Sequence, residues 1–294
     1  MSMVRLLLGC LLIGLTACGG AGSGPTAASQ KKDQKYPILL EREYEPGKEY
    51  RVRIKDGTTE TAVMSSQGKL VNETKKLTLL SFVGTRKVLS AGKDQPSEYT
   101  VEELSLTTDG PAQVLLPPGT KLLASPVAGK WQYTVEGKPL GEGLDDALGT
   151  LLGDRVGGPG DDAIFGTKTP RAVGERWDID MTKLPDDELN FDPAGASGST
   201  RVVALRSVDG VECLEIEAQM SIPKVQLKGL PAEAKFLGAS TAARFLGLFP
   251  TDTKLPSLSQ GMSMDMSFQM EVMSPHGPVQ VDAKTLGERT VNRE

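Results

Sequence analysis

The chain has 294 residues and a mildly acidic composition, with 33 lysine and arginine residues against 38 aspartate and glutamate residues. This balance excludes the basic surface that nucleic-acid binding requires, and no local cluster of lysine or arginine replaces it. One histidine excludes histidine-based zinc sites by count, and no phosphate-loop motif is present, so we expect neither nucleic acid nor a cofactor.

The N-terminal segment predicts export and not a membrane-spanning helix. Arg5 provides a positive charge, and an uncharged apolar run follows from Leu6 to Leu15. This run is shorter than the roughly 20 apolar residues that cross a bilayer. It ends in Leu15-Thr16-Ala17-Cys18, which resembles a bacterial lipobox, the signal at which a lipoprotein precursor is cut just before its cysteine.

The resemblance implies that residues 1–17 are a lipoprotein signal peptide and that Cys18 becomes the acylated N-terminus. The alternative is an ordinary signal-peptidase site with an incidental cysteine. Several acyl chains would hold the protein at a membrane essentially permanently. Gly19 stands where an inner-membrane retention aspartate would lie, which favours the outer membrane, on its periplasmic or surface face. Residues 18–35 are rich in Gly, Ala, Ser and polar residues and predict a flexible linker.

Residues 36–294 predict a β-rich domain, because apolar and polar residues alternate over long stretches. The alternation is clear over residues 50–54, and Asp56-Gly57 then predicts a turn. Further strands are expected at residues 69–80, 82–89, 99–106, 131–135, 201–208, 211–222 and 279–283. Asp209-Gly210 predicts a hairpin turn between two of them. Residues 231–249 combine helix-favouring alanines with flanking prolines, and we favour strands there.

Residues 137–174 interrupt this pattern with ten glycines and one helical signal. Apolar residues recur there at helical spacing, which predicts a short amphipathic helix over residues 143–152. The stripe consists of Leu140, Leu144, Ala147, Leu148, Leu151 and Leu152. A glycine-rich run after the helix predicts a mobile loop.

A short internal repeat suggests two related β halves. Residues 174–181 repeat the Gly-x-x-aromatic-x-aliphatic-x-apolar spacing of residues 47–54. The halves would cover residues 36–137 and 172–294 and would be joined by the glycine-rich helix and loop segment.

These elements predict a mostly β protein with an antiparallel curved sheet, either a half-barrel or two related β halves, and one short amphipathic helix. The pattern resembles the half-barrel of periplasmic lipoprotein-carrier and lipid-binding lipoproteins (LolA-like and LppX-like). The resemblance implies a membrane-anchored, non-enzymatic module that binds an apolar ligand or an envelope protein. A purely structural or assembly lipoprotein is the alternative, and an enzyme is the third hypothesis.

Few residues carry catalytic chemistry. His276 lies between two prolines in an expected turn, and no serine or cysteine motif supports a catalytic device around it. Acidic residues crowd one loop at residues 186–188 and 192, without the spacing of an EF-hand. Because Cys10 belongs to the signal peptide and Cys18 to the anchor, Cys213 has no disulfide partner and is interpreted as a structural cysteine. We therefore expect no catalytic residue and no metal site.

The strongest candidate surface is a stripe of methionines on one predicted strand face. Its members are Met262, Met264, Met266, Phe268 and Met270, which occupy alternate positions. Flexible thioethers on one face can fill a core, line a site for an apolar ligand, or hold Cu(I), which prefers soft ligands. The continuation of the stripe into Phe268 and Val272 favours the first two interpretations over copper.

The copper hypothesis has a direct test. We expect the double substitution Met264→Leu and Met266→Leu to leave the Cu(I) affinity unchanged, because leucine keeps the apolar volume and removes only two soft ligands. Competition with a Cu(I) chelator measures this affinity against the unsubstituted chain. A clearly weaker affinity in the double variant would establish thioether coordination and contradict the prediction.

Overall fold

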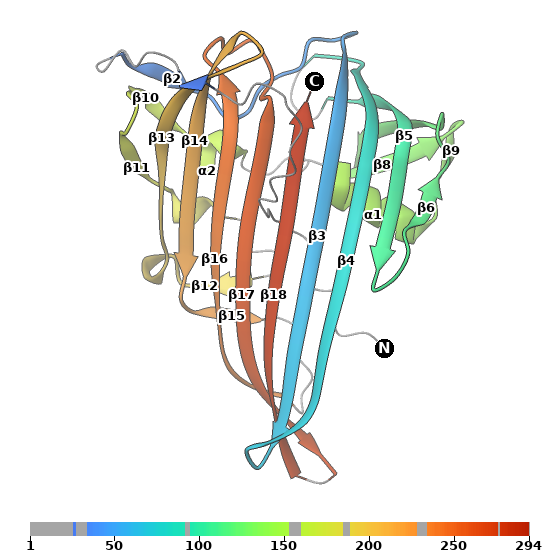
Figure 1. The fold of residues 1–294 in the computed structure, drawn as a ribbon, viewed down its shortest axis with the longest axis vertical. Coiled ribbons are helices and arrows are strands. Elements are labelled where there is room, and N and C mark those ends of the chain that lie inside the picture. Colours follow the sequence, from blue (N-terminus) through green and yellow to red (C-terminus); the bar gives the residue numbers. More distant parts are fainter. Residues whose placement is uncertain are drawn as a thin grey trace.

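The computed structural model describes residues 26–27, 34–91, 95–152, 160–184, 189–227, 234–275 and 277–293. One antiparallel sheet of 14 strands dominates the fold, and it is curved and not closed (Figure 1). This confirms the predicted fold class.

The strands of the large sheet, in chain order, are β1 (Thr26–Ala27), β3 (Glu49–Ser66), β4 (Lys69–Val88), β5 (Ser97–Thr108), β6 (Gln113–Leu116), β7 (Lys121–Val127), β8 (Lys130–Val135), β9 (Lys138–Pro139), β11 (Arg176–Asp178), β13 (Ser197–Val208), β14 (Val211–Ile222), β16 (Ala234–Pro250), β17 (Ser259–Ser274) and β18 (Gly277–Arg293). Two small sheets pair β2 (Tyr36–Ile38) with β10 (Thr167–Arg171) and β12 (Leu189–Phe191) with β15 (Val225–Leu227). The helices are α1 (Glu142–Leu152) and α2 (Asp161–Ile164), with 3-10 turns η1 (Met181–Lys183) and η2 (Pro193–Gly195).

Neighbouring strands of the large sheet follow the order β1-β13-β14-β16-β17-β18-β3-β4-β5-β7-β8-β9. The sheet is therefore built from two meanders that lie side by side. The C-terminal meander runs from β13 to β18, and the N-terminal meander runs from β3 to β9. They meet where β18, the last strand of the described chain, pairs with β3. The five strands around this junction are the longest, with 16 to 20 residues each.

The prediction of a turn at Asp56-Gly57 is wrong. Both residues lie inside β3, opposite Leu80 and Leu79 of β4. The chain turns instead at Gln67-Gly68, where φ is 51° and 75°. The β-branched threonines that follow Gly57 favour an extended strand, and both neighbours, β18 and β4, continue the ladder past this point.

The other strand predictions are largely confirmed, and the strands are longer than expected. The two strands expected at residues 69–80 and 82–89 form one strand, β4, and the strand expected at 279–283 extends over the whole of β18. Residues 234–250 form β16, as favoured for this ambiguous segment. The Asp209-Gly210 turn is confirmed, with φ of 50° and 82°.

Buried apolar side chains form two separate cores. The β14 core includes Trp177, Val202, Leu205, Leu214, Ile216, Ile222 and Phe249, and three residues from the start of the domain, Tyr36, Ile38 and Leu40. The β4 core includes Phe82, Tyr99, Leu104, Leu122, Tyr133, Leu148 and Leu151, and Val291 from the end of the domain. Each core therefore joins residues that are far apart in the sequence.

Helix α1 confirms the predicted amphipathic helix. Its whole apolar stripe packs in the β4 core, where Leu148 and Leu151 are fully buried. The guanidinium of Arg289 in β18 donates hydrogen bonds to the carbonyl oxygens of Thr150 and Leu151, at 3.4 and 3.2 Å. These bonds use carbonyls that the last turn of a helix leaves free, and the cation lies at the negative end of the helix dipole. They hold the end of α1 against the sheet.

The internal repeat has matching local geometry. Gly47 and Gly174 adopt φ of 81° and 88°, and their N–H groups donate to Val88 and Val202 on the neighbouring strands. The aromatic residues three positions later are equally buried, at 7% exposure. The similarity then ends, because β3 continues for 18 residues and β11 for three.

Within the predicted linker, Thr26 and Ala27 form β1 and pair with Ser207 and Arg206 of β13, so these two residues depart from the expectation of an unstructured segment. Cys18 and the signal peptide lie outside the described residues. None of the helices in the described ranges has the length and hydropathy of a bilayer-spanning segment.

Two glycine substitutions test the revised course of β3 and β4. A Cβ atom at Gly84 would lie 2.2 Å from the carbonyl oxygen of Thr100, whereas one at Gly57 would meet ordinary contacts of 3.4 Å or more. We expect Gly84→Ala to destabilise the protein by about 2 kcal/mol through overpacking. Gly57→Ala should be neutral or stabilising by up to about 1 kcal/mol, because alanine costs less entropy in a strand. Urea unfolding measures both, and a marked loss of stability in Gly57→Ala would contradict the strand assignment.

Candidate functional site

The candidate site is the face of the central strands against which α1 packs, which we call the inner face. Residues directly opposite each other in an antiparallel ladder project to the same side of the sheet. Met262 lies opposite Arg289, the residue that contacts α1. Because side chains alternate along a strand, the other members of the predicted methionine stripe share this inner face.

On the inner face, the central part of the stripe forms a ridge of long side chains between two columns of small ones, whereas Met262 and Met270 have larger neighbours. Met264, Met266 and Phe268 are its central members. On β16 they lie opposite Ala243, Thr241 and Ala239, and on β18 opposite Gly287, Thr285 and Ala283. Small neighbours on both sides leave a long, flexible thioether room to change rotamer. The ridge can therefore adapt its shape to an apolar molecule.

The methionines do not belong to either core. Phe268 packs at the margin of the β14 core, but Met262, Met264, Met266 and Met270 are in neither hydrophobic cluster. Met266 is 2% exposed, and the other three are half-buried. Met266 is therefore buried as a core residue is, whereas the other three methionines present a half-buried apolar surface between the two cores.

A polar wall faces the ridge from β3 and β18. Asp56 is 9% exposed and lies opposite Arg289, and Thr58 and Thr285 are also buried on the inner face. Burial raises the pKa of Asp56, and the Arg289 charge lowers it by less. Burial likewise raises the pKa of Glu60, with Lys76 on β4 opposing this. The inner face thus combines an apolar ridge with the buried carboxyl group of Asp56 and the half-buried one of Glu60.

Some polar atoms of this face have no hydrogen-bond partner among the residues that the structure describes. They are Oδ2 of Asp56, Oγ1 of Thr241 and Oγ1 of Thr200, all buried. A buried polar atom without a partner costs about 1 to 3 kcal/mol, so natural structures usually satisfy it with protein, water or ligand. These atoms mark positions where water or the polar part of a ligand would be stabilised.

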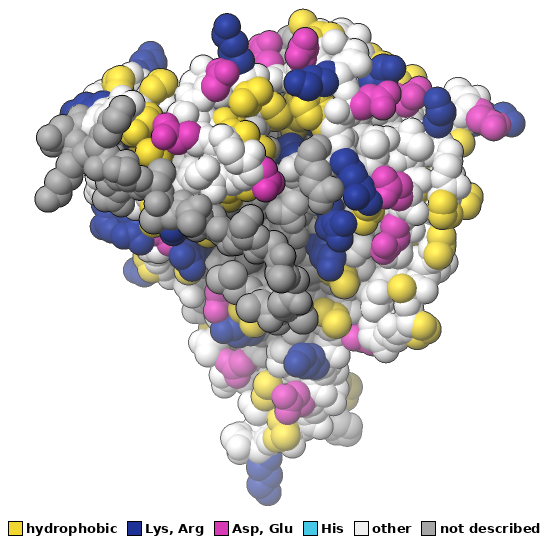
Figure 2. Space-filling view, turned by 45° about the horizontal axis from the view of Figure 1, so that its top comes forward, with side chains coloured by type: hydrophobic (Ala, Val, Ile, Leu, Met, Phe, Trp, Pro, Cys, Tyr) yellow, Lys and Arg dark blue, Asp and Glu magenta, His cyan; other side chains and the backbone are white. Residues whose placement is uncertain are grey.

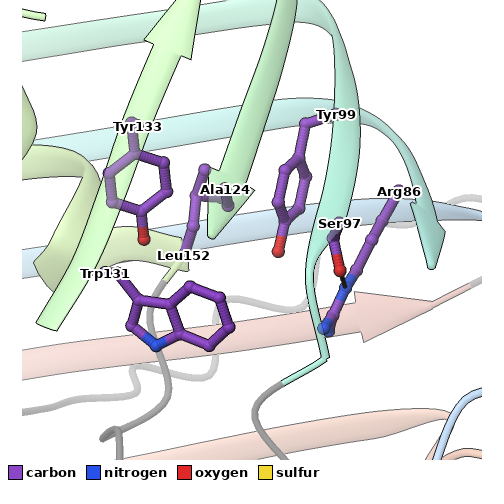
Figure 3. Close-up of a pocket in the computed structure, with 7 residues that line it drawn as sticks. All are labelled: Arg86, Ser97, Tyr99, Ala124, Trp131, Tyr133 and Leu152. Carbon is purple, nitrogen blue, oxygen red and sulfur yellow. Dashed lines mark hydrogen bonds between the residues drawn. The ribbon is translucent and has the colours of Figure 1, made fainter. Parts of the chain in front are cut away.

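A small hollow lies beside the β4 core (Figure 3). Its lining residues are Arg86, Ser97, Tyr99, Ala124, Trp131, Tyr133 and Leu152. Nε of Arg86 donates to Oγ of Ser97 at 3.0 Å, and its guanidinium lies 4.3 Å from the ring centre of Tyr44. The volume of about 10 Å³ is that of one water molecule, so the hollow does not fit an organic ligand.

A larger, open groove of about 480 Å³ runs along β5, β7 and β8. Its walls include the exposed ion pair between Lys121 and Glu98, at 3.4 Å, and the turn at Glu136-Gly137. Exposed ion pairs of this kind contribute little binding energy. The inner face therefore remains the better candidate.

Among the other predicted site residues, His276 and the acidic residues 186–188 lie outside the described residues. The carboxylate of Asp192 accepts a hydrogen bond from Ala194 N in η2. Cys213 is fully buried, and burial raises the pKa of its thiol to about 11, which suits a structural cysteine. In the described ranges, no group of three His, Cys, Asp or Glu residues could hold a metal ion.

The buried carboxyl groups were missed in the sequence, although a signal was present. Tyr50, Val52 and Ile54 define the inward phase of β3, and Asp56 and Glu60 continue the same phase. Because a turn was predicted at Asp56-Gly57, the strand was expected to end before these positions, and neither carboxyl group was assigned to the inner face.

The buried carboxyl of Asp56 generates a pH prediction. Its pKa is raised above the unfolded value of 3.8, so the folded protein binds more protons than the unfolded chain between the two values. The unfolding free energy that Asp56 contributes therefore falls as the pH rises through that window. We expect Asp56→Asn to gain stability relative to the unsubstituted chain from acidic to neutral pH. Urea unfolding over this range measures the difference, and a difference independent of pH would contradict it.

Comparisons with known proteins add little to this picture. No family model matches the sequence, and no curated protein matches it. A lipovitellin structure on lipid–protein interactions has 8% identity and a TM-score of 0.34, and the match covers 85% of this chain but 25% of the lipovitellin chain. An outer membrane channel from Pseudomonas putida F1 has 13% identity and a TM-score of 0.23, covering 85% of this chain and 97% of the channel. The Pseudomonas aeruginosa protein OccK2 (OpdF), in complex with glucuronate, has 8% identity and a TM-score of 0.21, with 83% and 96% covered. The chain thus spans about a quarter of lipovitellin, and TM-scores this low carry no functional argument.

Proposed function

We propose that the protein is a non-enzymatic lipoprotein of the bacterial cell envelope, and that its inner face binds an apolar ligand of lipid type. The observation that carries the binding proposal is the methionine stripe between the two cores, in which Met264 and Met266 have small neighbours on both sides. Methionine-rich surfaces accommodate apolar partners of varied shape.

The polar wall supports an amphipathic ligand over a pure hydrocarbon. Asp56 and Arg289 lie in the same inner row as Met262, and Asp56 Oδ2 has no hydrogen-bond partner within the described part of the chain. A lipid with a hydroxyl or amide near its head group could donate to this oxygen while its chain lies along the ridge. Binding would satisfy a buried polar atom and cover apolar surface in one step.

The membrane anchor is proposed from the lipobox at Cys18, with the outer membrane favoured. Seven residues lie between Cys18 and the first residue of β1, so the eight steps of an extended chain give a reach of about 28 Å. β1 pairs with β13 beside the Asp209-Gly210 turn, at the end of the sheet opposite the tips of the long hairpins. In this arrangement the anchored end faces the membrane and the hairpin tips point away from it.

A matched pair of substitutions on β17 tests ligand binding. The probe is a dansyl-labelled undecanoic acid, whose fluorescence rises on transfer to an apolar site. We expect Met264→Lys, which places a charge on the inner ridge, to weaken binding of the probe to the full chain by at least about tenfold. Ser263→Lys places the same charge on the outer face of the same strand and should leave binding unchanged.

Equal effects of the two substitutions, or no binding to the unsubstituted chain, would contradict the proposed ligand face. Thermal unfolding of each variant serves as the folding control. A structural or assembly lipoprotein would then be the better account.

A further inference from the structure

The N-terminal part of β4 is a free edge of the sheet. The ladder between β4 and β5 begins only at Thr78, opposite Thr108. From Lys69 to Leu77, β4 pairs with β3 on one side and has no strand on its other side among the described residues. Figure 1 shows the β3–β4 and β17–β18 hairpins projecting beyond the shorter strands that flank them.

The backbone groups that face this open side can be assigned from the end of β5. Leu77 N–H donates to the Asp109 carboxylate at 2.7 Å, and Asp109 N–H donates to the Leu77 carbonyl at 3.1 Å. Both backbone groups of Leu77 therefore point away from β3. Because this direction alternates along a strand, the N–H and C=O groups of Lys75 and Glu73 point the same way. Together they present four backbone groups ready to pair with an added strand.

The side chains along this edge are basic and partly apolar. Lys69, Lys75 and Lys76 outnumber the one acidic residue, Glu73, and all of them are exposed. Leu70 and Val71 are 65% and 60% exposed, among the most exposed large apolar side chains in the described chain. At the narrow lower end of the molecule, hydrophobic side chains lie close to basic and acidic ones on the surface (Figure 2).

A second copy of the chain is disfavoured at this edge. It would bring the same excess of lysine over glutamate to the pairing, and like charges directly opposite each other are destabilising. A bilayer is also disfavoured, because unpaired backbone groups cost several kcal/mol each in hydrocarbon. Lysines on an exposed edge strand commonly protect proteins against edge-to-edge pairing with another copy.

We propose that the edge of β4 from Val71 to Lys76 binds an extended acidic segment of a partner protein, which adds a strand to the sheet. The four outward backbone groups supply the hydrogen bonds, as in other cases of strand addition. Lys75 and Lys76 select acidic side chains opposite them, and Val71 supplies an apolar contact at the far end. This binding is independent of the ligand proposed for the inner face.

Two fluorescein-labelled peptides test the proposal on the full chain. The acidic peptide Glu-Glu-Val-Thr-Val-Val, aligned antiparallel, places its glutamates opposite Lys76 and Lys75, and its twin replaces both glutamates with lysine. The acidic peptide forms two opposite-charge pairs with Lys75 and Lys76, whereas its twin forms two like-charge pairs. We therefore expect the acidic peptide to bind at least about tenfold more tightly at low salt. Fluorescence anisotropy measures this ratio, which should shrink at high ionic strength.

Substitutions at Lys75 separate the charge from the backbone hydrogen bond. Lys75→Gln removes only the charge, whereas Lys75→Pro also removes the outward N–H, which the ladder with β3 does not use. We expect the affinity for the acidic peptide to fall in the order unsubstituted chain, Lys75→Gln, Lys75→Pro. Lys55→Gln, an exposed lysine on the outer face of β3, is the matched control and should bind as the unsubstituted chain does.

Equal affinity for the two peptides, or no binding of either, would overturn the proposal. So would a dimer in sedimentation that Lys75→Gln or Lys75→Pro dissociates, since it would assign the edge to a second copy. Should Lys75→Pro fail to fold by circular dichroism, Lys75→Gln and the salt dependence decide the outcome on their own. A Lys75→Gln variant that discriminates between the peptides as strongly as the unsubstituted chain would then count against it.

Discussion

The pairing of β18 with β3 is the contact on which the rest of the structure depends. It joins the end of the described chain to its first long strand and connects two antiparallel meanders into one sheet. It also brings the methionine face of β17 into one surface with the buried carboxyl groups of β3. Without this pairing, the ridge and the polar wall would belong to two separate sheets, and the inner face would not exist as a single surface.

The inner face departs from the rule that the covered side of a sheet is apolar. This departure costs free energy of folding, because carboxyl groups lose contact with water. Asp56 and Glu60 occupy positions at which an aliphatic residue would extend the β4 core, and burial raises the pKa of both. Natural proteins commonly break such local rules where they function and compensate elsewhere. Here the two complete cores on either side supply the compensation, since both form without the methionines or the buried carboxyl groups.

Local patterns predicted much of this fold and one side of the candidate site. Period-two alternation found the strands, the helical stripe found α1, and the Asp209-Gly210 signal found its turn, because each depends on neighbouring residues only. The same kind of signal failed at Asp56-Gly57, where pairing with two long neighbours overrides a turn preference. Alternation also placed the methionines on one face. That this face lies outside both cores depends on the β18–β3 pairing, a contact between distant parts of the chain that no local pattern encodes.

The central claim is that a membrane-anchored chain holds an apolar ligand on its inner face. Mass spectrometry of the full chain, extracted gently from the envelope, tests both parts when its denatured and native masses are compared. The account predicts a denatured mass that starts at an acylated Cys18, and a native mass larger by one lipid molecule. A chain without acyl groups would contradict the anchor, and a native mass equal to the denatured mass would contradict the bound lipid.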